Sequence, residues 1–320
     1  MRKIMKIIED LKQLNMTFLN GSGVALGNFD GLHKGHISLL RRHLEACHKK
    51  GLAAGVFTFS NHPAHVLLKG RPFSLIMSND EKIALLGASG LDFLILQAFD
   101  EAFREISAND FIMNILVHTL NAKHITVGQN FRFGKQGLGT VEMLEKAGAA
   151  HGFSVTVVPL YEAKSKVVSS TAIRKLVQIG DMSGAQTMLG RPYTVTGVVK
   201  LGKQLGSKIG FPTLNILPES WRLLPKFGVY MTKTTIGDHT YKSITNVGIN
   251  PTVGDPSPRI ETHLLDFSGD LYGQIITVSF LGKIRSEKKF ESVQALQTQI
   301  AIDVKKARDY FALIQNCTGK

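Results

Sequence analysis

Residues 27–36, with the sequence GNFDGLHKGH, form the stretch that decides the fold of the first half of this chain. An apolar run at residues 24–26 precedes it, and a helical pattern of apolar residues begins at Ile37. A strand, a glycine-rich loop and a helix are therefore expected in this order. The N-terminus of such a helix offers unpaired N–H groups and the positive end of a dipole to an anion.

Two histidines, His33 and His36, give this junction its chemistry. Imidazole N–H groups are hydrogen-bond donors, and the neighbouring glycines allow the backbone to approach a ligand closely. The alternative is a surface turn with two incidental histidines. The strand–loop–helix context favours a nucleotide-phosphate site.

The composition is typical of a globular protein. The 320 residues are enough for two domains, and 43% of them are hydrophobic. Two cysteines, Cys47 and Cys317, are too few for a disulfide framework. The N-terminus lacks the apolar core of a signal peptide, and no run is long enough to cross a bilayer. We therefore expect a cytoplasmic protein.

The net charge of +13 is compatible with anionic partners of more than one kind. Lysines and arginines are spread along the chain, without a basic stripe interleaved with aromatic residues. We expect small-molecule substrates, and neither a nucleic acid nor a membrane as partner. The oligomeric state does not follow from the sequence.

The first 160 residues alternate between strand and helix patterns, which predicts a parallel sheet with helices on both faces. The loop with the two histidines then lies at the carboxyl end of the first strand, where such sheets bind ligands. The expected strands are residues 23–27, 53–59, 91–96, 124–128 and 153–159, and the expected helices lie near 37–49, 80–88, 109–120 and 140–151.

A second segment, residues 164–174 (KSKVVSSTAIR), points to the same site. Ser169 and Ser170 are candidate N-caps of a short helix, and Arg174 lies one turn into that helix. By itself the segment could equally be an ordinary serine-capped helix with a solvent-facing arginine. Together with the histidine loop it favours phosphate binding.

The pattern changes after residue 192, and the chain is expected to divide into domains 1–186 and 187–320. Short alternating runs broken by Gly, Pro, Asn and Asp predict an antiparallel barrel or sandwich from residue 193 to 280. An amphipathic helix is predicted at about 290–311. Its apolar face is expected to hold Val293, Leu296, Ile300, Val304 and Ala307.

Polar residues on two predicted strands of this domain could form a second site. Thr213 and Asn215 share one side of an extended segment and could serve one ligand or metal. Glu261 is a candidate general base for an alcohol nucleophile, although a cross-strand pair with an arginine is the plainer interpretation. The glycines upstream imitate a P-loop, but Gln204 replaces its Ser or Thr, and no helix is expected to follow.

Six motifs in the same order resemble the bifunctional prokaryotic riboflavin kinase/FAD synthetase family over nearly the full length. They are GNFDGLHKGH, VGQNFRFGKQGLG (127–139), SSTAIR (169–174), GFPTLN (210–215), NVGINPT (246–252) and ETHLLDFSGDLYG (261–273). The resemblance implies a Rossmann-like nucleotidyltransferase domain and an antiparallel β-barrel kinase domain. It implies phosphorylation of riboflavin to FMN and adenylylation of FMN to FAD with release of pyrophosphate, with ATP as co-substrate and Mg²⁺ as cofactor.

For the adenylyltransferase, the resemblance implies His33, His36 and Arg174 as catalytic residues. It places Gly27, Asn28, Phe29, Asp30, Gly35, Ser169, Ser170 and Thr171 at the ATP phosphates, and Phe59, His62, Pro63, Asn130 and Phe131 near the flavin or nucleotide.

For the kinase, the resemblance implies Glu261 as catalytic base, Thr213 and Asn215 at Mg²⁺, and Arg285 beside the flavin. It places Gly202, Lys203, Gly206, Lys208, Gly210, Thr213 and Asn215 at ATP.

The chain departs from the family pattern at Asn61, Ser207 and Asn250, which bears on flavin and ATP affinity. Three alternatives remain at this stage. One of the two modules could be the only active one, or the chain could be a non-catalytic flavin or nucleotide binder. The chain could also be a different nucleotidyltransferase with the histidine loop, but the β domain would then have no role.

Overall fold

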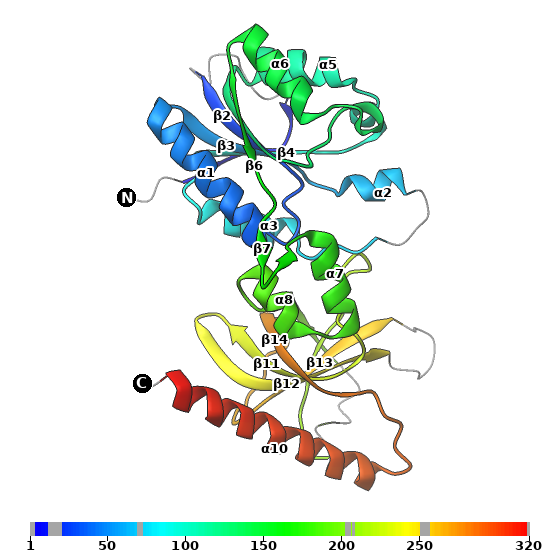
Figure 1. The fold of residues 1–320 in the computed structure, drawn as a ribbon. Coiled ribbons are helices and arrows are strands. Elements are labelled where there is room, and N and C mark those ends of the chain that lie inside the picture. Colours follow the sequence, from blue (N-terminus) through cyan, green and yellow to red (C-terminus); the bar gives the residue numbers. More distant parts are fainter. Residues whose placement is uncertain are drawn as a thin grey trace. The chain divides into compact units, whose positions relative to one another are not determined.

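A six-stranded sheet forms the centre of the first half of the chain, and all its strand pairs are parallel (Figure 1). The strand order is β1-β4-β3-β2-β5-β6. Five strands match the predicted ones, while β1 is a short edge strand that no pattern indicated. The bounds are β1 Lys6–Ile8, β2 Ser22–Leu26, β3 Ala53–Phe59, β4 Phe93–Gln97, β5 Ala122–Gly128 and β6 Ser154–Val158.

Helices cover both faces of this sheet, as predicted (Figure 1). Helices α1 (Lys34–Lys50) and α3 (Asn79–Gly87) pack on one face, where they bury residues such as Leu40 and Leu86. Segments η3 (Phe111–Thr119) and α6 (Val141–His151) pack on the other. Successive strand residues alternate between the two cores, which is why the strands are apolar throughout.

One predicted helix has a different hydrogen-bond pattern. Residues 109–120 were expected to be α-helical, but only α5 (Ala108–Asp110) is, and η3 continues it as a π-helix. The N–H of Leu120 donates to the carbonyl of Ile115, five residues back, at 2.9 Å. The apolar periodicity predicts the buried face of this segment but not the width of its turns. The remaining short elements are α2 Pro63–Leu67, α4 Glu101–Arg104, η4 Lys135–Gly137 and the hairpin β7 Glu162–Ala163 with β8 Lys166–Val167.

The second half of the chain forms a closed antiparallel barrel, which decides between the predicted barrel and sandwich. The strand order is β10-β13-β12-β11-β14-β9. Buried aromatic rings such as Tyr193, Tyr230 and Phe280 fill it, together with hydrogen-bonded threonine and serine hydroxyls. The bounds are β9 Tyr193–Lys200, β10 Leu214–Ile216, β11 Gly228–Ile236, β12 His239–Ile249, β13 Pro258–Leu264 and β14 Ile275–Ser286.

Helix α10 (Val293–Thr318) packs on the outside of this barrel. Its buried side includes Ala307 and Phe311, while Leu296, Ile300 and Val304 are half-buried. Val293 was predicted on this side but is 50% exposed. The difference arises at the helix start, since Ser292 caps the helix and the buried stripe begins only at Leu296.

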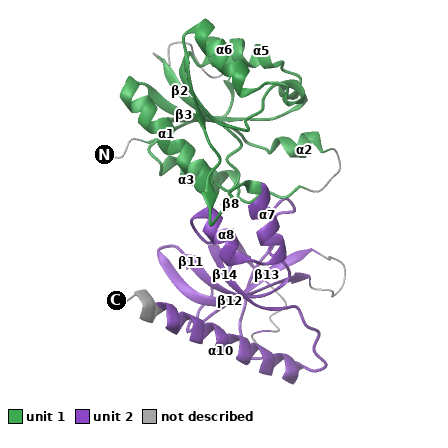
Figure 2. Ribbon diagram, viewed as in Figure 1, with its two compact units in different colours: residues 1–170 green, residues 171–320 purple. Residues whose placement is uncertain are grey.

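Two compact units, Met1–Ser170 and Thr171–Lys320, divide the chain (Figure 2). Helices α7 (Ser170–Ile179) and α8 (Met182–Leu189) thus fall almost entirely in the barrel unit, although the sequence pattern changes only after them. Lys226 donates its backbone N–H to the carbonyl of Val177 at 3.2 Å, which ties α7 to the barrel. The computed structural model describes residues 4–11, 21–68, 73–201, 206, 209–249 and 257–318.

Candidate active sites

The loop between β2 and α1 has a constrained backbone. Phe29 (φ 49°), Gly31 (φ 81°) and Leu32 (φ 36°) all adopt left-handed conformations. Residues other than glycine adopt these only where the surroundings enforce them, and both side chains are fully buried. The loop lies at the carboxyl end of the central strand β2, between β3 and β5, where the strand order reverses. It is therefore a fixed loop at the place where such sheets bind ligands.

The two histidines of this loop lie face to face at the start of α1. Their ring centroids are 3.6 Å apart at an interplanar angle of 14°. His33 Nδ1 accepts a hydrogen bond from the backbone N–H of His36 at 3.2 Å, so the ring proton of neutral His33 is on Nε2. A side chain on Gly35 would meet the His33 ring at 3.1 Å, which explains the glycine between the histidines.

His36 contains a buried atom that needs a partner. Burial lowers the pKa of His36 well below its usual value, and the nearby charges of His33 and Lys82 lower it further. The ring is therefore neutral at pH 7. Its Nδ1 is buried and has no hydrogen-bond partner in the described part of the chain. Leaving such an atom unsatisfied costs about 1–3 kcal/mol, which a substrate atom would recover.

Lys82 and Asp30 connect the loops that follow β2 and β3. Lys82, on α3, is 7% exposed, and its Nζ donates to the carbonyl of Phe59 at 3.0 Å. Both carboxylate oxygens of Asp30 accept from the backbone N–H of Ile76, at 3.1 and 3.2 Å. Burial lowers the pKa of Lys82, and Asp30 raises it. These hydrogen bonds link the histidine loop and α3 to the segments that follow and end β3.

Ser170 joins the second phosphate motif to the histidine loop. Its hydroxyl donates to the backbone carbonyl of Asp30 at 2.8 Å, a contact between residues far apart in the sequence. Ser169 also belongs to the first unit, whereas Thr171 and Arg174 belong to the second. The predicted phosphate contacts of these four residues stay predictions.

The other residues predicted for this site have diverse environments. Asn28 is exposed and Gly27 half-buried at the end of β2, while the Phe29 side chain is fully buried, so only its backbone can face a ligand. His62 caps α2 by accepting from the N–H of Ala64 at 3.1 Å. Asn61, Phe59, His62 and Pro63 line a small pocket after β3 together with Asn28, Asp30 and Lys82. Asn130 and Phe131 follow β5, the first exposed and the second half-buried against Phe133.

Asn61 has a structural role that a proline could not fill. Its Nδ2 donates to the carbonyl of Phe99 at 2.7 Å, and its Oδ1 accepts from the N–H of Phe99 at 2.8 Å. Asparagine, which departs from the family pattern at this position, therefore links the loops after β3 and β4 through these hydrogen bonds. Ser207 and Asn250 lie outside the described residues.

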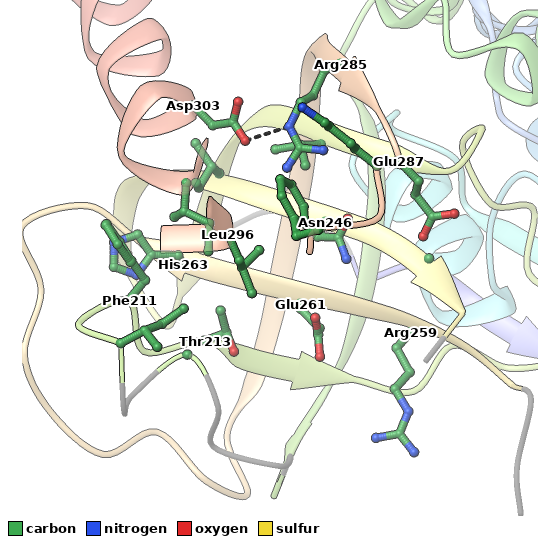
Figure 3. A pocket seen from close by; sticks show the side chains of 18 of the residues that line it. Phe211, Thr213, Asn246, Arg259, Glu261, His263, Arg285, Glu287, Leu296 and Asp303 are labelled. Carbon is green, nitrogen blue, oxygen red and sulfur yellow. Dashed lines mark hydrogen bonds and ion pairs between the residues drawn. The ribbon is translucent and has the colours of Figure 1, made fainter. Parts of the chain in front are cut away.

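A pocket of about 740 Å³ lies between the barrel and the first half of α10 (Figure 3). The strand register places one pocket residue from each of five strands in a single row across the barrel. Along β13, Arg259, Glu261 and His263 face this pocket and the residues between them face the barrel interior. The row consists of Asn215, Glu261, Asn246, Val229 and Arg285.

Glu261 is flanked by an amide on each neighbouring strand. Asn215 pairs with it from β10, and Asn246 pairs with it from β12. Asn215 is 5% exposed, and its Oδ1 has no hydrogen-bond partner in the described residues. Thr213 lines the same pocket, as predicted from its spacing to Asn215. An alternative to the catalytic interpretation, a surface pair of Glu261 with an arginine, is not among the ion pairs of the described chain.

Arg285 is fixed at the other end of this row. Its Nε donates to Asp303 on α10 at 2.8 Å (Figure 3), and the second oxygen of Asp303 accepts from Gln299 at 3.0 Å. Asp303 is 1% exposed. The guanidinium also lies over the ring of Phe290, 5.6 Å from its centroid. A buried carboxylate from the end of the chain thus holds the cation predicted to lie beside the flavin.

The remaining predicted kinase residues are described only in part. Gly206 lines the pocket, and its carbonyl accepts from the N–H of Phe211 at 2.8 Å. Gly210 has φ 84° in the turn that follows. Gly202, Lys203 and Lys208 lie outside the described residues.

Three site residues were not assigned a role from the sequence: Lys82, Asn246 and Asp303. The sequence does contain an indication for Lys82 and Asp303, because a charged residue at an apolar position of an amphipathic helix indicates a buried partner. Asp303 lies three residues after Ile300 on α10, and Lys82 lies four before the buried Leu86 on α3.

In the parts of the chain that are described, no helix is long and apolar enough to cross a membrane.

Comparison with known proteins assigns both halves. The family model described as FAD synthetase matches residues 16–172, and the one described as riboflavin kinase matches residues 189–311. A "Bifunctional riboflavin kinase/FMN adenylyltransferase" of Escherichia coli strain K12 is 34% identical over 97% of this chain and 99% of its own length. The protein of that name from Bacillus subtilis is 35% identical over 91% of this chain and 93% of its own length.

A solved structure shares the fold of the whole chain. It is described as a macrolide-efflux protein from Streptococcus pneumoniae, is 31% identical and covers 95% of this chain and 99% of its own, with a TM-score of 0.84. The two family models match the two halves that carry the histidine loop and the barrel pocket. The chain belongs to the bifunctional riboflavin kinase/FMN adenylyltransferase family and is an enzyme with both activities.

Proposed function

We propose that the barrel pocket is the riboflavin kinase site and that the histidine loop is the FMN adenylylation site. The observation that carries the first assignment is the row Asn215–Glu261–Asn246, which places a carboxylate between two amides on the pocket floor. A volume of about 740 Å³ is also within the range of small-molecule sites.

Glu261 acts as the general base of the kinase reaction. The terminal ribityl hydroxyl of riboflavin is a neutral nucleophile, and Glu261 accepts its proton as the oxygen attacks the γ-phosphorus of ATP. The bond from phosphorus to the bridging oxygen breaks, and ADP leaves. Asn246, on the other side of Glu261, is positioned to orient the carboxylate or the ribityl chain.

Thr213 and Asn215 are suited to Mg²⁺ and the ATP phosphates. The buried Oδ1 of Asn215 is an oxygen without a partner, and the hydroxyl of Thr213 lines the same pocket. Mg²⁺ takes oxygen ligands alongside phosphates and water, and in phosphoryl-transfer enzymes these include the hydroxyl of Ser or Thr and the amide of Asn. The ion would neutralise phosphate charge during transfer.

Arg285 and the apolar wall of the pocket are suited to the flavin ring. Val229, Ile244, Leu296 and Ile300 offer apolar contacts, and Arg285 offers donors to the carbonyl edge of the ring. Arg285 lies at the opposite end of the row from Asn215. The flavin therefore extends from Arg285 toward Glu261, with the nucleotide beyond it.

The adenylylation site works by alignment and charge stabilisation. The phosphate of FMN is already anionic, so its oxygen attacks the α-phosphorus of ATP without a general base, and pyrophosphate leaves. The unpartnered Nδ1 of His36, the Nε2–H of His33 and the N-terminus of α1 are suited to the phosphates. Ser169, Ser170, Thr171 and Arg174 complete this set in our proposal.

Product analysis tests both assignments together. The purified protein with riboflavin, ATP and Mg²⁺ should yield FMN and then FAD on a chromatogram. FMN with ATP and Mg²⁺, in the absence of riboflavin, should yield FAD, and omission of Mg²⁺ should stop FMN formation. Unchanged riboflavin would contradict the kinase assignment, and accumulation of FMN without FAD would contradict the adenylylation assignment.

A further inference from the structure

The strand pairing beside the proposed kinase site is interrupted at the start of β10. The pairing of β10 with β13 begins at Leu214, which lies opposite Thr262. Thr213, one residue earlier, would lie opposite His263 if the ladder continued. It does not continue, because Pro212 precedes Thr213 and has no N–H to donate. Of the two residues proposed to hold Mg²⁺, Thr213 therefore lies just outside the strand pairing, whereas Asn215 lies within it.

The side chain of His263 bridges this end. Its Nδ1 donates to the carbonyl of Pro212 at 2.8 Å, and its ring meets the ring of Phe211 edge to face, with centroids 5.6 Å apart. Nδ1 must carry a proton for this bond, since a carbonyl can only accept. The imidazole thus supplies a hydrogen bond between the two segments where the strand pairing has ended. This bond fixes the backbone on the N-terminal side of Thr213.

His263 also lies on the same strand as the proposed base, Glu261. His263 and Glu261 lie two residues apart on β13 and face the same pocket (Figure 3). Movement of the 211–213 segment relative to β13 would therefore change the separation between Thr213 and the proposed base. Phosphoryl transfer depends on such alignment, so a small displacement is expected to matter.

We propose that His263 is a positioning residue of the kinase, which holds Thr213 in place relative to Asn215 and Glu261 through its bond to Pro212. This inference rests on the proposed nucleotide role of Thr213 and Asn215. It assigns His263 no proton transfer to the substrate.

Three substitutions of His263 separate the donor from the ring. Asparagine places an N–H close to the position of Nδ1, glutamine places it further out near Nε2, and leucine has no donor. His263→Leu and His263→Gln should raise the KM for Mg²⁺–ATP in FMN formation about tenfold, the effect of losing one well-placed hydrogen bond. His263→Asn should stay within about threefold of the native enzyme. The KM for riboflavin should change little in all three.

The second activity of the chain is the control for folding. Adenylylation of supplied FMN should proceed at the native rate in every variant, because the histidine loop of its proposed site lies in the other unit and no proposed adenylylation residue is changed. An unchanged KM for Mg²⁺–ATP in His263→Leu overturns the inference. Equal loss of kcat in the Asn and Leu variants also overturns it, because it would indicate acid–base chemistry by the ring.

A failure of the underlying assignment gives a different result. Thr213→Val and Asn215→Ala should raise the same KM and the Mg²⁺ requirement. If these two variants bind the nucleotide normally, the proposed nucleotide site is wrong. If they are impaired while His263→Leu is not, the site stands and only the positioning role of His263 fails.

Discussion

In our proposal, the histidine loop and the barrel pocket bind phosphates in two physically different ways. The loop relies on a helix N-terminus, stacked imidazoles and a constrained backbone at the end of a parallel sheet. The pocket relies on side chains that project from one face of an antiparallel barrel, in a row set by strand register. In the first site the backbone shapes the ligand environment, and in the second the side chains do.

The difference follows the charge of each nucleophile. FMN attacks with an anionic phosphate, so its site needs donors and alignment, and the buried neutral His36 fits that need. Riboflavin attacks with a neutral hydroxyl, so its site needs a proton acceptor, and Glu261 fits that need. Two transfers from the same co-substrate thus place different demands on the protein.

The sharpest test of this comparison is removal of the proposed base. Glu261→Gln keeps the shape of the side chain but removes its charge, and Glu261→Ala removes both. Either should slow FMN formation by roughly 10²–10⁴-fold, the usual range for a general base. Initial rates of FMN formation measure this, with FAD formation from supplied FMN as control. A near-normal rate would reassign Glu261 to a structural role.

The matching test in the other site is His36→Ala. It should slow FAD formation from FMN by roughly 10²-fold, the scale of losing one preorganised charge-stabilising group. Riboflavin phosphorylation should be retained, since its site lies in the other unit. If both activities fell together, the two sites would not be separable as we propose.

A smaller effect is expected from Asp303→Asn. The amide would still fill the space but would no longer neutralise Arg285, and a charge-assisted hydrogen bond would be lost. The KM for riboflavin should rise about tenfold, with less change in the KM for ATP. Lys305→Gln, at an exposed position on the same helix, is a matched control that should behave like the native enzyme. An effect on ATP alone would place Arg285 away from the flavin.

The last prediction concerns stability and pH rather than rate. Two buried histidines of the first unit, His43 and His124, share the hydroxyl of Thr126 at 3.0 and 3.2 Å. Burial, assisted by His124, lowers the pKa of His43 to about 4. The unfolded chain binds a proton near pH 6.5 that the native state does not bind until about pH 4. Stability should therefore fall as the pH drops through this window, by about 3 kcal/mol at most for His43.

Urea unfolding of the full chain at pH 7 and pH 5 measures this dependence. His43→Gln should flatten the pH dependence of unfolding of the first unit, whatever it does to stability at pH 7. Parallel pH dependences for the native and variant proteins would contradict the shifted pKa.

The local patterns explain why so much of the fold was predictable. Apolar runs predicted five of the parallel strands, and the two-residue spacing of Thr213 and Asn215 correctly placed both on the pocket side. Edge strand β1 was missed because three residues carry too little periodicity. The width of the turns in η3 was missed because α- and π-helices bury similar stripes.

The local geometry of the candidate site residues was predictable where a motif is contiguous and not where partners meet across the chain. His33 and His36 form one local structure, so their spacing carried the information. Asp303 meets Arg285 only because α10 packs on the barrel, and Lys82 meets Phe59 only because α3 packs under β3. No spacing along the sequence encodes these contacts.

The sequence by itself determined the parallel sheet and the β domain, and it supplied the candidate reacting groups, because these depend on short-range periodicity and on residue chemistry. Only the tertiary structure decided that the β domain closes into a barrel, that Asn215, Glu261 and Asn246 form one row, and that His263 bonds to Pro212. Those features depend on strand register and closure, which arise from contacts between segments distant in the chain.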